Sequence, residues 1–151
     1  MNNKKYLFSK EYSDIHNDDS RWFICDIEFD ELYTEETIIQ GYKVKHNGKC
    51  KICVYDNEGV IPHFHIENID KTFSCCIRLD KPEYFSHGEH DDKLTNSDIK
   101  KLIKELSKKV DKTSNITNFE YMCIAWNKHK AKTKNKIKEP YKMPDYTKLN
   151  D

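Results

Sequence analysis

The fold is decided by residues 49–66, which read KCKICVYDNEGVIPHFHI. The run 49–55 carries the β-branched and aromatic side chains typical of a strand, and the polar cluster 56–59, with its glycine, predicts a turn. A second strand is expected over residues 63–69. Because the connection between the two strands is short, they are expected to pair in the antiparallel direction.

Two histidines stand two positions apart at the start of the second strand. Successive side chains of a strand point to opposite faces of its sheet, so we expect His63 and His65 on one face and Phe64 and Ile66 on the other. Histidines at this spacing can bind a metal, because both rings reach one point in front of the sheet. The alternatives are a metal-free acid–base pocket, or half-buried rings that are hydrogen-bonded to their neighbours.

A second pair of histidines, His87 and His90, lies next to the acidic residues Glu89 and Asp91. If this loop folds back over the strand, it can complete a site for a divalent transition metal such as zinc. The predicted ligands are His63, His65, His87 and His90. In such a site Glu89 or Asp91 is the expected general base.

Working outward from the central strands, the same patterning predicts further strands at residues 22–29, 37–44 and 72–79. The apolar spacing then changes to that of helices. Residues 95–98 form an N-cap signal, and residues 117–120 match the capping box. We therefore expect an α+β fold, in which an antiparallel sheet of about five strands is covered on one face by two C-terminal helices.

Apolar residues thin out after Trp126. We expect one domain over residues 1–127, with an N-terminal arm at 1–20 and a lysine-rich tail at 128–151. The charge is divided unevenly along the chain: residues 99–151 hold 14 Lys and 6 acidic residues, whereas residues 1–98 hold 12 Lys or Arg and 20 acidic residues. The tail residues that could contact phosphates of a nucleic acid are Lys128, Lys130, Lys132, Lys134, Lys136 and Lys138.

The six cysteines are expected to be reduced thiols that pack as small apolar side chains. Cys50 and Cys53 are three positions apart, which places them on opposite faces of a strand, so a zinc knuckle with Cys75 and Cys76 is not expected. No stretch approaches the roughly 20 apolar residues of a membrane span. No signal peptide is apparent either, so we expect a cytoplasmic chain.

Residues 49–130 resemble the small bacterial family called domain of unknown function 4160. The resemblance rests on a strand and turn followed by Pro62-His63-Phe64-His65-Ile66, and on a last helix that contains Trp126. It implies a small cytosolic protein of a prokaryote or mobile element, encoded beside another small protein in a toxin–antitoxin-like pair. No enzymatic activity is attached to the family.

Three functions follow as hypotheses. The first is a non-enzymatic bacterial or phage protein that binds another protein, either as half of a toxin–antitoxin-like pair or as an inhibitor of a host defence enzyme. Its candidate anchors are Trp22, Phe23, Tyr33 and Tyr42, since aromatic side chains dominate binding hot spots. The second is a metal-dependent hydrolase or nuclease that uses His63 and His65. The third is a nucleic-acid-binding module that uses the basic tail.

Overall fold

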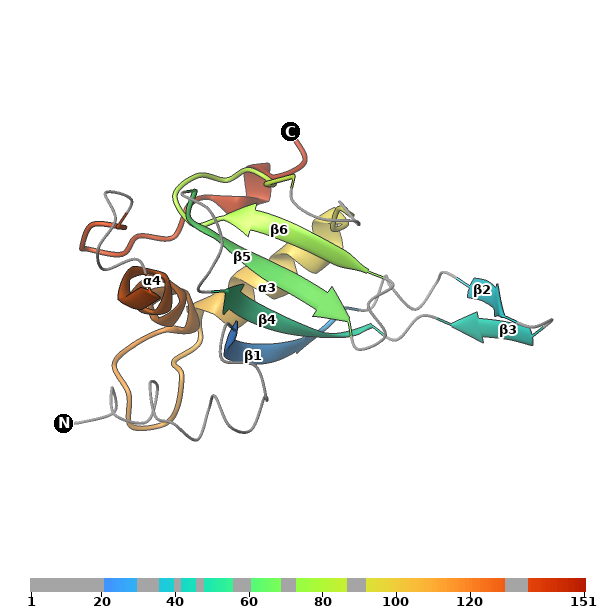
Figure 1. Cartoon of the computed structure of the whole chain (residues 1–151), viewed down its shortest axis with the longest axis horizontal. Coiled ribbons are helices and arrows are strands. Elements are labelled where there is room, and N and C mark those ends of the chain that lie inside the picture. Colours follow the sequence, from blue (N-terminus) through green and yellow to red (C-terminus); the bar gives the residue numbers. More distant parts are fainter. Residues whose placement is uncertain are drawn as a thin grey trace.

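The computed structural model describes residues 21–29, 36–39, 42–45, 48–55, 61–68, 73–86, 92–129 and 136–151. Its main sheet has four antiparallel strands in the order β1-β4-β5-β6 (Figure 1). These strands are β1 (Arg21–Glu28), β4 (Lys49–Tyr55), β5 (His63–Asn68) and β6 (Ser74–Arg78). The helices are α3 (Asn96–Ser107), α4 (Asn118–His129) and the short 3-10 helix η2 (Tyr146–Lys148). The α+β class with an antiparallel sheet is therefore confirmed.

The main sheet has four strands where about five were expected. The expected strand 37–44 is instead two short strands, β2 (Glu36–Ile39) and β3 (Tyr42–Lys45), which form a separate two-stranded sheet. Ile39 pairs with Tyr42, so the chain reverses within this run. The run contains a glycine, which is unfavourable inside a strand and favours a tight hairpin, but the apolar residues on either side of it led to the prediction of one continuous strand. β1 consequently pairs with β4, which lies much later in the chain.

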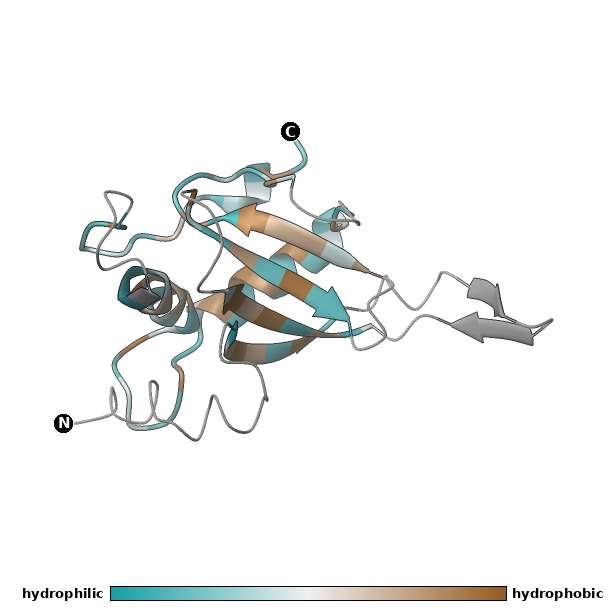
Figure 2. Ribbon diagram, viewed as in Figure 1, coloured by the Kyte–Doolittle hydropathy of each residue, from teal (hydrophilic) through white to brown (hydrophobic). Residues whose placement is uncertain are grey.

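The register of the strands sorts their side chains onto two faces. Ile52 on β4 pairs with Ile66 on β5, and Phe64 on β5 pairs with Ile77 on β6. All four side chains are fully buried in one hydrophobic core. Hydrophobic and hydrophilic positions alternate along β5 in Figure 2, as expected for a strand with one core-facing side.

Both helices contribute to the same core. α4 contacts β1 and β4, and α3 passes behind the sheet in the view of Figure 1. Their core residues are Ile99, Leu102, Leu106, Phe119, Tyr121, Met122, Cys123, Ala125 and Trp126. On α3 the buried positions recur at three- and four-residue intervals, which is the spacing of one helical face.

Each helix begins with the cap that the sequence predicts. The hydroxyl of Thr95 accepts a hydrogen bond from the backbone N–H of Asp98. At α4 the hydroxyl of Thr117 accepts from the N–H of Glu120, at 3.1 Å, and a carboxylate oxygen of Glu120 accepts from the N–H of Thr117, at 3.0 Å. This reciprocal pair is the capping box, which is confirmed.

The C-terminal segment 136–151 packs on the domain, which differs from the expected tail. Tyr146 is fully buried in the core, and Leu149 is buried beside it. The side-chain amide of Asn127 donates to the carbonyl of Ile137, and its oxygen accepts from the N–H of Ile137, both at 2.7 Å. The sparse apolar residues among the lysines therefore belong to the core of the domain.

Candidate functional site

The face of the sheet opposite the core carries both histidines of β5, and we call it the histidine face. Residues that pair across neighbouring strands share a face, so the register defines its members. They include Phe23, Lys51, Cys53, Tyr55, His63, His65, Glu67 and Cys76, together with Arg21, Asp26, Ser74 and Arg78. The expectation that His63 and His65 point the same way is confirmed, with 5.1 Å between their ring centroids.

His63 lies at the end of this face where α4 approaches the sheet. Its ring is 4.6 Å from the ring of Phe85 and 5.7 Å from that of Trp126, and 1% of the residue is exposed. Nδ1 of His63 lies 2.6 Å from the carbonyl oxygen of Ile61. Because a carbonyl only accepts, Nδ1 carries a proton and the lone pair of the neutral ring is on Nε2.

His65 lies at the centre of a row that crosses three strands. It pairs with Cys53 on β4 and with Cys76 on β6. The sulfur of Cys76 lies 3.3 Å from Nδ1 of His65 and 4.0 Å from Nε2. A thiol within hydrogen-bond reach of an imidazole is the arrangement of a cysteine nucleophile with its base.

Tyr55 holds the other side of the His65 ring. The two ring centroids are 4.5 Å apart, and the rings meet edge to face at 69°. The hydroxyl of Tyr55 donates to a carboxylate oxygen of Glu67 at 2.9 Å. Burial, with the negative charge of Glu67, raises the pKa of the Tyr55 hydroxyl above its ordinary value, so this hydroxyl remains a donor.

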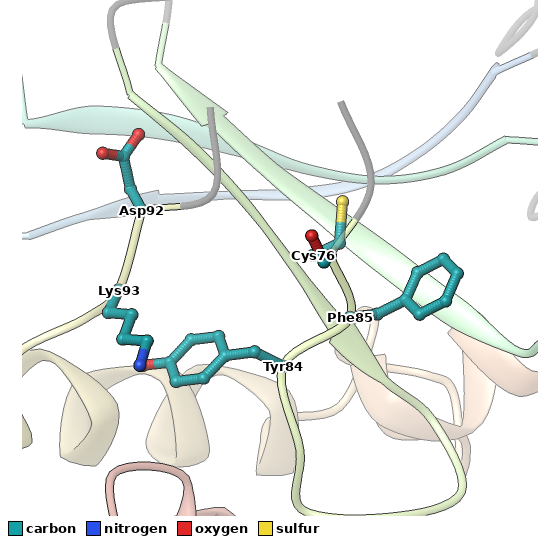
Figure 3. A pocket seen from close by; sticks show the side chains of 6 residues that line it. Cys76, Tyr84, Phe85, Asp92 and Lys93 are labelled. Carbon is teal, nitrogen blue, oxygen red and sulfur yellow. The ribbon is translucent and has the colours of Figure 1, made fainter. Parts of the chain in front are cut away.

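A pocket of about 270 Å³ opens beside β6 (Figure 3). Its walls come from Cys76 on β6 and from two nearby segments, and the other lining residues are Tyr84, Phe85, Ser86, Asp92 and Lys93. The N–H of Phe85 donates to the carbonyl of Cys76 at 2.8 Å, and the N–H of Asp92 donates to the carbonyl of Ser74 at 3.0 Å. Both segments are therefore hydrogen-bonded to β6, and the pocket lies between them.

The cysteines differ in their surroundings. Cys25, Cys75 and Cys123 have thiol pKa values raised above the ordinary value, chiefly by burial. Cys50 belongs to the core, whereas Cys53 lies on the histidine face, so the expected opposite placement of this pair is confirmed. Cys76 is 4% exposed, faces His65 and lines the pocket.

The predicted metal ligands are only partly described. His63 and His65 lie together, whereas His87, His90 and the expected bases Glu89 and Asp91 fall outside the described residues. Ser86 and Asp92, which flank that segment, both line the pocket with Cys76. Within the described ranges, no group of three or more His, Cys, Asp or Glu side chains is arranged to hold a metal ion. The four-histidine site therefore stays a prediction.

The aromatic residues predicted to bind a protein partner do not lie on one surface. Trp22 is half-buried and packs against the core. Phe23 is half-buried on the histidine face, where the ammonium of Lys51 lies 5.8 Å from the centre of its ring. Tyr42 lies on β3, whose side chains are not described, and Tyr33 falls outside the described residues.

The lysines predicted to bind nucleic acid are described at three positions. Lys128, near the end of α4, is exposed, as are Lys136 and Lys138 on the segment that Asn127 holds. Lys130, Lys132 and Lys134 fall outside the described residues.

Cys76 is the site residue that the sequence alone did not single out as functional. Its partner His65 is 11 positions earlier, and their contact depends on the pairing of β5 with β6. Strand alternation places Cys75 and Cys76 on opposite faces, but only the register shows which of the two meets a histidine.

No helix among the described residues has the length and apolar character needed to cross a membrane. No protein-family model matches the chain, and neither a curated protein nor a solved structure matches it. The resemblance to domain of unknown function 4160 therefore stays a prediction.

Proposed function

We propose that this chain is a small, non-enzymatic, cytoplasmic protein of bacterial or phage origin that binds a protein partner through its histidine face. The observation that carries the proposal is the presence of half-buried aromatic and charged side chains on the sheet face opposite the core. In this proposal α3 covers the core face and Trp126 of α4 reaches His63 at one end of the histidine face, so the partner contacts the rest of that face.

The composition of the histidine face supports binding to a protein. Phe23 and Tyr55 are half-buried there, and aromatic side chains provide much of the affinity in protein interfaces. Lys51 and Glu67 pair across β4 and β5 and are also half-buried. Such charges set the orientation of a partner and its rate of association more than its affinity.

The first partner to test is a small protein encoded beside this chain, because the family resemblance implies a toxin–antitoxin-like pair. The alternative, that the chain inhibits a host defence enzyme, rests on the excess of acidic residues before residue 99. Both forms of the proposal require a surface that recognises another folded protein.

The experiment compares two charge reversals, Lys51→Glu on the histidine face and Lys104→Glu on the exposed side of α3. The chain is co-expressed with its neighbouring small protein, and the Kd is measured by calorimetry. If the histidine face is the interface, Lys51→Glu weakens binding by roughly tenfold or more, and Lys104→Glu leaves it unchanged. Equal effects of the two reversals contradict the proposed face. If the neighbour does not bind, that pairing is wrong.

A metal-dependent hydrolase is a second candidate, favoured by the 5.1 Å separation of the two histidine rings on one face. Its test is the metal content of untagged protein, measured by elemental mass spectrometry. Near one equivalent of zinc, manganese or iron, lost in the His63→Ala/His65→Ala double variant, supports it. Metal-free protein that also fails to take up added metal contradicts it.

Nucleic-acid binding by the basic C-terminal region is the third candidate. The exposure of Lys128, Lys136 and Lys138 supports it. Affinity for RNA or DNA is expected to fall steeply with salt, because lysine–phosphate contacts release counterions. An affinity that does not change with salt removes this candidate.

A further inference from the structure

The thiol of Cys76 belongs to an arrangement that extends over three strands. Its sulfur is 3.3 Å from Nδ1 of His65 on the neighbouring strand, and the His65 ring is held from the other side by Tyr55. Tyr55 is in turn hydrogen-bonded to Glu67. A nucleophile, a base within hydrogen-bond reach and a group that orients the base are the recurring parts of a reactive thiol site.

We infer that Cys76 is a modification site, at which its sulfur forms a mixed disulfide with a small amino-acid disulfide of the cystine class bound in the adjoining pocket. This site is separate from the proposed protein-binding function and does not depend on it.

The charged and aromatic side chains of the pocket suit this class of ligand. Its volume is about 270 Å³, with aromatic walls from Tyr84 and Phe85. Asp92 and Lys93 supply one carboxylate and one ammonium, and they lie on the side of the pocket away from Phe85 (Figure 3). An amino-acid zwitterion carries the complementary pair of charges. An apolar pocket with a few placed polar groups is the usual form of a small-molecule site.

The charged side chains are held in position by the fold. A carboxylate oxygen of Asp92 accepts a hydrogen bond from the N–H of Ser74 at 2.9 Å, which fixes it beside β6. The ammonium of Lys93 lies 5.7 Å from the ring centroid of Tyr84. The Tyr84 hydroxyl accepts from the N–H of Leu94 at 3.0 Å, so the ring itself is anchored.

The other cysteines are less suited to the reaction. Cys25 is the most exposed of the six, but burial of its sulfur and the nearby carboxylates of Glu105 and Asp26 raise its thiol pKa, which disfavours the reactive thiolate. Cys75, next to Cys76 in the chain, points into the core. Of the six cysteines, Cys76 is the one that lines this pocket.

The exchange is balanced without any further reactant. The Cys76 thiol gives its proton to the imidazole of His65, and the thiolate attacks one sulfur of the small disulfide, RSSR. The bond from Cys76 sulfur to RS forms as the RS–SR bond breaks, and the leaving thiolate takes the proton to become RSH. Cys76 is oxidised to the disulfide level, and the small disulfide is the oxidant.

The test uses the full chain, reduced, freed of reductant and incubated with cystine. Intact-mass spectrometry measures the rate of adduct formation, and peptide mapping of the wild-type chain identifies the modified cysteine. The adduct is expected on Cys76 first. It should be absent in Cys76→Ser and should form at the wild-type rate in Cys75→Ser, the matched control. A first adduct on Cys25 or on any other cysteine overturns the inference.

Two further variants separate positioning from folding. His65→Gln should slow the reaction by roughly 100-fold with cystine and also with the uncharged hydroxyethyl disulfide. Asp92→Asn should raise the half-saturating cystine concentration and leave the rate with hydroxyethyl disulfide unchanged. Wild-type rates in His65→Gln overturn the role of the imidazole, and equal slowing of both disulfides by Asp92→Asn overturns the assigned ligand class.

Discussion

The hydroxyl of Tyr146 donates a 2.6 Å hydrogen bond to the backbone carbonyl of Arg78, the last residue of β6. The two residues are 68 positions apart in the chain, and Tyr146 is fully buried. The C-terminal segment is therefore bound to the sheet by both packing and a polar contact, which accounts for the buried tyrosine in a stretch otherwise rich in lysine.

This contact predicts a graded loss of stability at position 146. Tyr146→Phe removes the hydrogen bond and should lower the free energy of unfolding by about 1 kcal/mol. Tyr146→Ala also leaves a cavity and should cost roughly 3–5 kcal/mol. Urea unfolding followed by circular dichroism measures both, with the exposed Lys148→Ala as the control. An Ala variant as stable as the wild type would show that the segment does not contribute to the core.

The sequence predicted those elements whose structure depends on local chemistry. The capping box of Thr117 and Glu120 and the shared face of His63 and His65 depend on spacings of two or three residues, and both are confirmed. The pairing of β1 with β4 could not be predicted, because the alternation of side chains does not specify which strands are neighbours. For the same reason the sequence did not indicate a role for Cys76, whose partner His65 is on another strand.

The C-terminal segment was misjudged for a different reason. Composition gives the average character of a stretch, and residues 128–151 are mostly polar. Tyr146 and Leu149 are three positions apart and both are buried, but two apolar residues do not make a periodic signal. A few contacts can dock such a segment, because Tyr146 is large and fully buried and its hydroxyl is hydrogen-bonded.

The capping box predicts a second stability effect, at the start of α4. Thr117→Ala removes the hydroxyl that accepts from the N–H of Glu120 and should lower the free energy of unfolding by about 1 kcal/mol. Thr117→Ser keeps the acceptor and should retain most of the stability. Thermal unfolding of the three proteins measures the difference. Equal loss in the Ala and Ser variants would assign the effect to the lost methyl group and not to the cap.

The environment of Tyr84 predicts a dependence of stability on alkaline pH. Burial raises the pKa of Tyr84 from 10.0 to about 12. Because the unfolded chain loses this proton more readily, the contribution of Tyr84 to stability is complete below pH 10 and is lost as the pH rises to 12. In Tyr84→Phe this loss cannot occur. Above pH 10 the free energy of unfolding should therefore fall more in the wild type than in Tyr84→Phe. Urea unfolding of both proteins at each pH measures the difference. A difference that stays constant up to pH 12 would contradict the raised pKa.

The burial of the two histidines predicts that their alanine variants lose stability whether or not a metal binds. His63 is 1% exposed and packs on Phe85 and Trp126, so His63→Ala should cost on the order of 2–3 kcal/mol. Urea unfolding of His63→Ala and of His65→Ala measures this cost.

Loss of activity in His63→Ala would consequently not distinguish a ligand from a packing residue. Added zinc does distinguish them, because an ion that binds only the folded chain raises the wild-type unfolding midpoint in proportion to its affinity. If these histidines bind a metal, zinc stabilises the wild type and leaves the conservative variant His65→Gln unchanged. If zinc changes neither protein, the histidines serve packing and the Cys76 contact alone.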